Sequence, residues 1–189
     1  LTIESSTISA NQDGGVGNVG GRVAIANSTI SGNIADTGGG LSNAHSDYYG
    51  DCPCTPGTLT LRDSLIAGNQ ATVGPEIEND AISIVNANNF NLFGTNGNAG
   101  VIGFSPGPTD IVPSVSLAQI LGPLQNNGGP TQTHALVAGS PAIDAGNPNG
   151  CLDSTGLPLQ TDQRGLPRAF DGNHDGTVRC DIGAFELQA

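Results

Sequence analysis

The chain contains no Met, no Trp and no Lys, and only 4% of its residues are aromatic. A sequence so poor in large side chains cannot fill a thick globular core. A solenoid avoids that requirement, because each coil adds only one Ile or Leu per strand to a narrow core. The 29 Gly and 12 Pro residues are a composition often seen in disorder, but the regularly spaced β-branched residues argue against disorder here.

Positive charge is also scarce. Five Arg residues stand against 17 Asp and Glu, which gives a net charge of -12. No basic stripe is available to neutralise phosphates, so nucleic acid is excluded as a partner. The sequence shows neither a signal peptide nor a membrane span, and it opens directly on a strand pattern without Met. We therefore expect either a processed mature protein or a piece of a longer one.

An eleven-residue phrase occurs three times, at residues 1–11, 23–33 and 59–69. Apolar residues alternate with Ser and Thr in each copy, which is the pattern of a β-strand and not of a helix. The first two copies begin about 22 residues apart, a spacing typical of stacked coils. The sequence therefore predicts a parallel β-solenoid.

Each copy of the phrase closes on Asn, and a second, shorter phrase places another Asn two positions after an apolar residue. The two sets are Asn11, Asn33 and Asn69, and Asn18, Asn43 and Asn79. Coils stacked at about 4.8 Å would align these side chains so that each amide bonds to the next. The alternative is that these residues only form turns, where Asn tolerates left-handed backbone.

The chain divides into three parts. Residues 1–96 carry about four coils, interrupted by a loop insertion at 45–56, and the Gly-, Pro- and Ser-rich residues 97–116 form a connecting stretch. Residues 117–189 form a turn-rich C-terminal capping and assembly module. Its apolar residues between 117 and 124 predict one short helix.

Four motifs in the second half of the chain accompany the STISGN-type coils. They are LGPLQNNGGPTQTHAL at 121–136, GSPAIDAGN at 139–147, TDQRGLPR at 161–168 and CDIGAFE at 180–186. In this combination the chain resembles the choice-of-anchor Q family of bacterial extracellular proteins. The resemblance implies an all-β, right-handed parallel β-helix of the pectin-lyase-like superfamily, secreted or displayed on the cell surface. It implies no particular reaction.

Four cysteines without a C-x-x-C pair favour an oxidising, extracellular compartment. The resemblance implies a disulfide between Cys151 and Cys180, and the alternative is two buried thiols. Cys52 and Cys54 either form a local disulfide in the insertion or, with His45, bind a soft metal. Sequence alone does not exclude crossed pairings.

Residues 171–177 follow the spacing of a calcium-binding loop, with side-chain oxygens at positions 1, 3 and 5 and Gly at position 6. The predicted ligands are Asp171, Asn173, Asp175 and Thr177, with Asp181 or Glu186 completing the set. Calcium is therefore the candidate ion. The alternative is an acidic turn that binds no metal.

Few other residues suggest chemistry. Arg164 and Arg168 are interpreted as structural ties to nearby carboxylates, with a clamp for an anionic substrate as the alternative. His134, inside a framework motif, is interpreted as a structural histidine. Arg62 beside Asp63 is the best candidate for a catalytic pair within the coils.

Two functions remain. The first is a non-catalytic extracellular β-solenoid, structural or adhesive, whose open strand edges stack head-to-tail into a filament. An extracellular glycan or matrix component would be its other partner. The alternative is a calcium-dependent polysaccharide lyase or glycoside hydrolase, although glycosidases need paired acids that the coils do not repeat at one offset.

Overall fold

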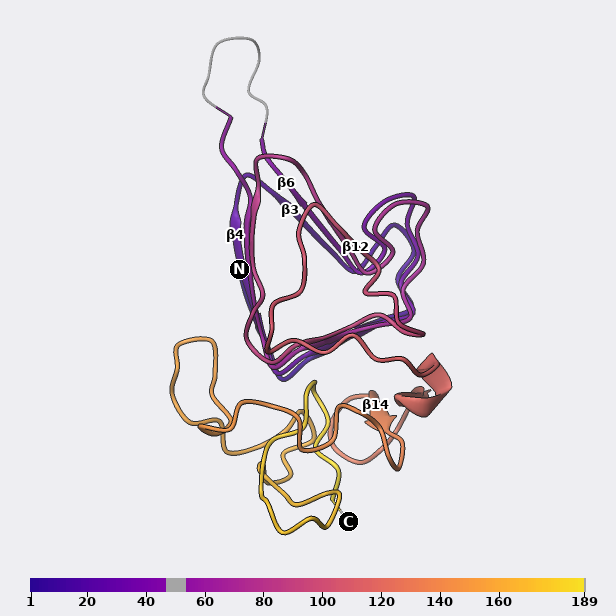
Figure 1. Cartoon of the computed structure of the whole chain (residues 1–189), viewed down its shortest axis with the longest axis vertical. Helices are drawn as coiled ribbons and strands as arrows, with labels where there is room; N and C mark the ends of the chain where they lie inside the picture. Colours follow the sequence, from indigo (N-terminus) through magenta and orange to yellow (C-terminus); the bar gives the residue numbers. More distant parts are fainter. Residues whose placement is uncertain (47–53, 189) are drawn as a thin grey trace.

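A computed structural model describes residues 1–46 and 54–188. Three parallel four-stranded sheets form the sides of a triangular prism, and each coil contributes one strand to each side (Figure 1). Sheet 1 contains β1 (Thr2–Glu4), β4 (Arg22–Ala26), β7 (Thr58–Arg62) and β10 (Ile84–Asn86). Sheet 2 contains β2 (Thr7–Ser9), β5 (Thr29–Ser31), β8 (Leu65–Ile66) and β11 (Leu92–Phe93). Sheet 3 contains β3 (Val16–Val19), β6 (Leu41–Ala44), β9 (Ile77–Asn79) and β12 (Val101–Ile102). The prediction of an all-β, parallel solenoid is confirmed.

The core is a stack of equivalent side chains. Ile8 pairs in register with Ile30, Ile30 with Ile66, and Ile66 with Phe93. Because successive side chains of a strand point to opposite faces, every second residue points into the prism. Ile30, Ile66 and Phe93 are completely buried there. Each such side chain contributes roughly 1.5–3 kcal/mol through burial, so a narrow column suffices without Trp or Met.

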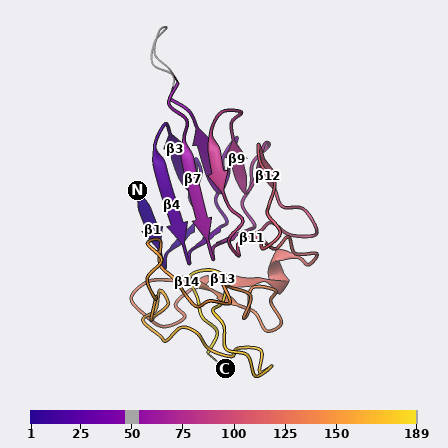
Figure 2. The ribbon, with the colours of Figure 1, turned by 60° about the vertical axis from the view of Figure 1, so that its left-hand side comes forward.

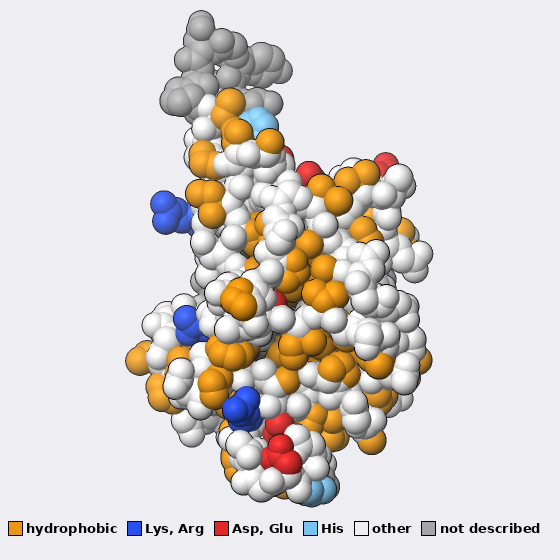
Figure 3. All heavy atoms as spheres, viewed as in Figure 1, with side chains coloured by type: hydrophobic (Ala, Val, Ile, Leu, Met, Phe, Trp, Pro, Cys, Tyr) orange, Lys and Arg blue, Asp and Glu red, His pale blue; other side chains and the backbone are white. Residues whose placement is uncertain are grey.

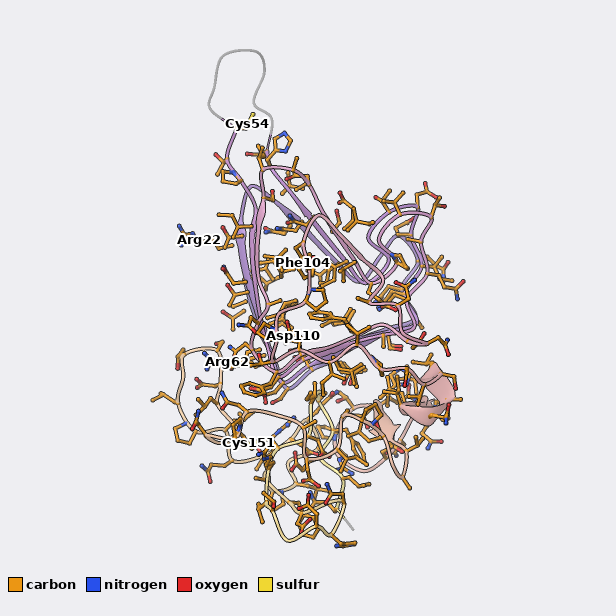
Figure 4. The ribbon with its side chains drawn as sticks, viewed as in Figure 1. Arg22, Cys54, Arg62, Phe104, Asp110 and Cys151 are labelled. Atoms are coloured by element: carbon orange, nitrogen blue, oxygen red, sulfur yellow. A yellow bond between two sulfur atoms is a disulfide. The ribbon has the colours of Figure 1, made fainter. Side chains whose placement is uncertain are left out.

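The fourth coil extends further than the sequence indicated. Its third strand, β12, lies within the stretch predicted to be a connection. The following residues cross the end of the prism, where the Phe104 ring meets the Phe93 ring edge-on at 6.0 Å (Figure 4). Ile111 pairs with Leu92 in β11. The coil-4 end of the core is therefore covered.

The prediction of one short helix over residues 117–124 is wrong. A three-residue 3-10 helix, η1 (Leu117–Gln119), leads into β13 (Leu121–Gln125), which pairs antiparallel with β14 (Thr133–Leu136). Gly122 and Pro123 explain the difference, because Pro lacks the N–H that a continuing helix needs. The described residues include no helix long and apolar enough to cross a membrane.

The C-terminal module lies against the outer face of sheet 2 (Figures 1 and 2). Leu65 and Leu92 point outward from this sheet and belong to a second buried cluster. From the module the cluster includes Ile120, Leu121, Leu136, Ala142, Ile143, Ile182 and Phe185. Sheet 2 is thus buried on both faces, and the module covers a side of the stack.

Candidate functional site

Asparagine side chains form a continuous hydrogen-bonded ladder at the corner after sheet 2. The Nδ2 group of Asn11 donates to Oδ1 of Asn33 at 2.8 Å, and Asn33 Nδ2 donates to Oδ1 of Asn69 at 2.9 Å. The backbone N–H of Asn11 and of Asn33 donates to the same oxygens, at 3.1 and 3.0 Å. Asn33 is completely buried. Each coil therefore satisfies polar groups of its neighbour, as a buried polar column requires.

Glu76 closes this ladder, which sequence reasoning missed. Its carboxylate accepts Asn69 Nδ2–H at 2.6 Å, the Asn69 backbone N–H at 3.2 Å and the Gly68 N–H at 2.8 Å. Burial raises the pKa of Glu76 to about 7, although its hydrogen bonds from Asn69 and Gly68 oppose the rise. A carboxylate, having no N–H of its own, ends the series of donors.

The sequence did contain a signal for this end. The residue before the sheet 3 strand is Gly15 in coil 1, Gly40 in coil 2 and Glu76 in coil 3. A Cβ at Gly40 would lie 2.5 Å from the Glu76 carbonyl oxygen and 2.9 Å from Asn69 Nδ2, so the ladder leaves no room for a side chain. The change from Gly to Glu marks the coil at which the ladder stops.

A second ladder runs along sheet 3. Asn18 Nδ2 donates to Asn43 Oδ1 at 2.7 Å, and Asn43 Nδ2 donates to Asn79 Oδ1 at 2.6 Å. Asn79 Nδ2 then donates to the carbonyl oxygens of Asp80 and Ser83 at 2.9 and 3.0 Å. Both predicted asparagine sets are thus brought together in space.

A third ladder was not predicted. At the corner between sheets 1 and 2, the backbone N–H of Ser6 donates to Ser28 Oγ, that of Ser28 to Ser64 Oγ, and that of Ser64 to Asn91 Oδ1, at 3.1–3.3 Å. The Asp110 carboxylate then accepts the backbone N–H of Asn91 and one Nδ2–H of its side chain, each at 3.0 Å. The recurrent Ser was visible in the sequence, but its role needed the turn geometry.

All three ladders have the same direction. Donors point from coil 1 towards coil 4, and the ladders end on Glu76 in coil 3, on the backbone carbonyls of Asp80 and Ser83, and on Asp110. The opposite end differs. Among the described residues β1, β2 and β3 are the outermost strands of their sheets, and Ile3, Ile8 and Val16 are only partly buried. Among the described strands, none pairs with the outer edges of β1, β2 and β3, and the apolar side chains of coil 1 lie between them.

The outer face of sheet 1 carries two hollows that share Thr60. One, of about 320 Å³, is lined by Leu1, Thr2, Arg22, Val23, Ala24 and Thr58. The other, of about 360 Å³, lies towards coil 4 beside Asn86, Asn88 and Asn89. The lining of both hollows mixes hydroxyl and amide groups with apolar atoms. Arg22 points away from the stack (Figure 4), and basic side chains are few on the face shown in Figure 3.

Arg62 and Asp63 do not form an open catalytic pair. Arg62 Nη1 donates to the Asp153 carbonyl oxygen at 3.2 Å, and Asp63 is completely buried. Asp63 Oδ1 accepts the Asn147 N–H at 2.8 Å, and burial raises the pKa of Asp63 to about 6. Both residues join the module to the stack.

The two module arginines lie among carboxylates. Arg164 contacts Asp162 at 2.7 Å, and its guanidinium stacks 3.6 Å from the centre of the Phe185 ring. Arg168 lies 3.5 Å from Glu186 and donates to the carbonyl oxygens of Asp181 and Gly183 at 3.3 and 2.7 Å. Arg168 is fully enclosed, an arrangement suited to a structural tie.

The predicted calcium loop is only partly assembled. Asp171, Asn173 and Asp175 all accept backbone N–H groups of residues 175–177, at 2.7–3.1 Å. Asp181 is buried elsewhere, where its carboxylate accepts the N–H groups of Asp144 and Leu187. Within residues 1–46 and 54–188, no three His, Cys, Asp or Glu side chains are grouped to hold a metal. Calcium binding stays a prediction.

Cys151 and Cys180 form a disulfide across a separation of 29 residues, with Cα atoms 5.6 Å apart, which confirms that pairing. Cys52 lies outside the described residues, so the predicted Cys52–Cys54 staple does too. Cys54 itself is exposed.

Comparison of the chain with protein-family models, curated proteins and solved structures finds no match. The resemblance noted from the sequence motifs therefore stays a prediction. The functional argument rests on the two unlike ends of the stack and on the outer face of sheet 1.

Proposed function

We propose that this chain is a non-catalytic extracellular scaffold, a right-handed parallel β-helix that associates with a second copy of itself through the coil-1 end. Right-handed winding follows the general preference of parallel crossover connections. An extracellular location agrees with the Cys151–Cys180 disulfide, since such bonds persist in oxidising compartments.

Strand edges that are unpaired among the described residues support this proposal most directly. At coil 4, Phe104 packs on the core. Two ladders finish on the carboxylates of Glu76 and Asp110, and the third finishes on backbone carbonyls. At coil 1, three strand edges surround the partly buried Ile3, Ile8 and Val16. Unpaired edges template pairing with another chain.

Head-to-tail stacking, as expected from the sequence, would bring this open end onto the covered coil-4 end. Pairing of two coil-1 ends joins like surfaces and closes after one contact. The geometry therefore favours a closed dimer over a filament.

The test is the size of the purified chain over a wide concentration range, by sedimentation velocity, with Thr2→Pro as the blocking variant. Ser5 N–H donates to the Ala26 carbonyl at 3.2 Å, so strand alternation points the Thr2 N–H off the sheet edge. Proline there removes an edge donor but no β1–β4 bond.

A wild-type dimer that Thr2→Pro dissociates supports the proposal. An open-ended series of oligomers would support head-to-tail stacking instead. A wild type that stays monomeric at the highest concentration contradicts both.

A glycan ligand is the second candidate, because the two hollows along sheet 1 are lined by hydroxyl and amide groups. Isothermal titration with pectin, alginate and cellulose fragments, with Thr60→Val as the variant, tests it. Sugar release with and without calcium tests the lyase or hydrolase alternative, in which Arg62→Ala would abolish turnover.

A further inference from the structure

Ser9 and His134 are 125 residues apart in the sequence and meet on the outer side of sheet 2. Ser9 ends β2, and its Oγ lies 2.9 Å from Nε2 of His134, which is on β14. The other ring nitrogen of His134, Nδ1, lies 2.8 Å from the carbonyl oxygen of Gly122 on β13. One imidazole thus bridges a hydroxyl and a carbonyl.

The chemistry of these partners determines where the protons lie. A carbonyl oxygen only accepts hydrogen bonds, so Nδ1 must carry the proton that faces Gly122. With the proton on Nδ1, the Nε2 lone pair faces Ser9, and the Ser9 hydroxyl is the donor in that tautomer. A nucleophile that donates to a base, whose other side is held by a third group, is the arrangement of an activated serine.

An apolar pocket of about 400 Å³ adjoins the pair. His134 itself lines it, together with Leu117, Leu121, Pro123 and Gly32 among others. The Ser9 Oγ lies 3.5 Å from the position that a Cβ would take at Gly32, which places the hydroxyl beside this pocket. Neither Ser9 nor His134 is fully buried, so a ligand can reach both.

We propose that Ser9 and His134 form an acyl-transfer site for carboxylic esters with an apolar acyl chain. Ser9 Oγ bonds to the ester carbonyl carbon and its proton passes to His134 Nε2. The ester C–O bond then breaks, and the leaving alcohol takes that proton. Water next attacks the acyl-serine, loses a proton to Nε2 and releases the carboxylic acid as Ser9 regains its hydrogen.

The scaffold role proposed above is non-catalytic because it uses only backbone strand edges. The Ser9–His134 activity is a second, separate function at the contact between the module and sheet 2, and it revises 'non-catalytic' for that contact alone. The competing interpretation is that the Ser9–His134 bond only docks the β13–β14 hairpin on coil 1. Covalent labelling separates the two, because a docking bond leaves the hydroxyl unreactive. The probe is an alkyl fluorophosphonate: Ser9 Oγ bonds to phosphorus, fluoride leaves, and the hydroxyl proton goes to Nε2.

The wild-type chain is incubated with this probe, and the modified residue is located by mass spectrometry in the tryptic peptide 1–22. Hydrolysis of p-nitrophenyl octanoate and acetate is followed in parallel. His134→Gln keeps an amide that can hold the hairpin but removes the base. Ser42→Ala is the matched control, since Ser42 lies in β6 of sheet 3 and does not line this pocket.

We expect one phosphonate on Ser9, a labelling rate about 10²-fold lower in His134→Gln, and normal labelling in Ser42→Ala. The octanoate should react faster than the acetate. Absence of label on wild-type Ser9, or an equal rate in a folded His134→Gln, would overturn the proposal. The labelling result for the wild-type chain alone can overturn the proposal, so the test remains valid even if a variant misfolds.

Discussion

Glu76 accepts the Nδ2–H of Asn69 at 2.6 Å, and this contact ends a column of side-chain amides that begins at Asn11. The carboxylate stands where a fourth coil would otherwise have to supply an amide. Asn96, which follows β11 at the position equivalent to Asn69, is exposed instead.

In the ladder that begins at Asn11, loss of an asparagine from the middle should lower the free energy of unfolding more than loss of the first one. Asn33→Ala removes bonds to Asn11, Asn69 and the Ile8 carbonyl and leaves buried groups unsatisfied. We expect the free energy of unfolding to fall by about 2–4 kcal/mol, since each unsatisfied buried group costs about 1–3 kcal/mol. Asn11→Ala, at the exposed end, should cost under about 1 kcal/mol. Urea denaturation of both variants measures the difference, and equal losses would contradict the ladder's contribution to stability.

Glu76 should make stability depend on pH. Its pKa is raised by burial from 4.5 to about 7, so the folded state binds this proton more tightly than the unfolded state. The resulting stabilisation is complete below about pH 4.5 and is lost as the pH rises to about 7, about 3 kcal/mol in all.

Glu76→Gln should remove this part of the pH dependence. The measurement is the free energy of unfolding at several pH values between about 4 and 8. Glu78→Gln, a change in the adjacent strand, is the control and should retain the wild-type slope. A Glu76→Gln slope equal to that of the wild type would count against burial of this carboxyl.

Gly40 should not tolerate a side chain. Its Cβ would meet the Glu76 carbonyl oxygen at 2.5 Å, a backbone atom that cannot move without shifting coil 3. We expect Gly40→Ala to lower the free energy of unfolding by about 2 kcal/mol or more, as overpacking does. Gly17→Ala is the control, because nothing lies within 4 Å of its Cβ position. Equal melting temperatures for Gly40→Ala and Gly17→Ala would refute the close approach at Gly40.

Arg168 should be needed for the module to stay docked. Arg168→Ala leaves Glu186 buried without its cation, which costs about 3–5 kcal/mol for a broken buried pair. Arg22→Ala, on the exposed face of sheet 1, should change stability by less than about 0.5 kcal/mol. Hydrogen exchange of β8 and β11 should speed up in Arg168→Ala alone. Unchanged exchange would mean that the apolar contacts hold the module without this arginine.

The sequence by itself determined the coils, because a period of two along each strand and a repeated phrase leave few other ways to bury the Ile column. The positions of both asparagine ladders followed from the same repetition. The Cys151–Cys180 pairing came from motif resemblance and was confirmed.

Tertiary structure decided the rest. Asp110 ends the serine ladder only because the chain folds back over coil 4, and no local pattern records that return. Residues 121–124 belonged to the predicted helix, and the pairing with β14 makes them part of a strand instead. The meeting of Ser9 with His134 depends on docking across 125 residues, where contact is set by packing of the module on sheet 2 and by nothing in the neighbouring sequence.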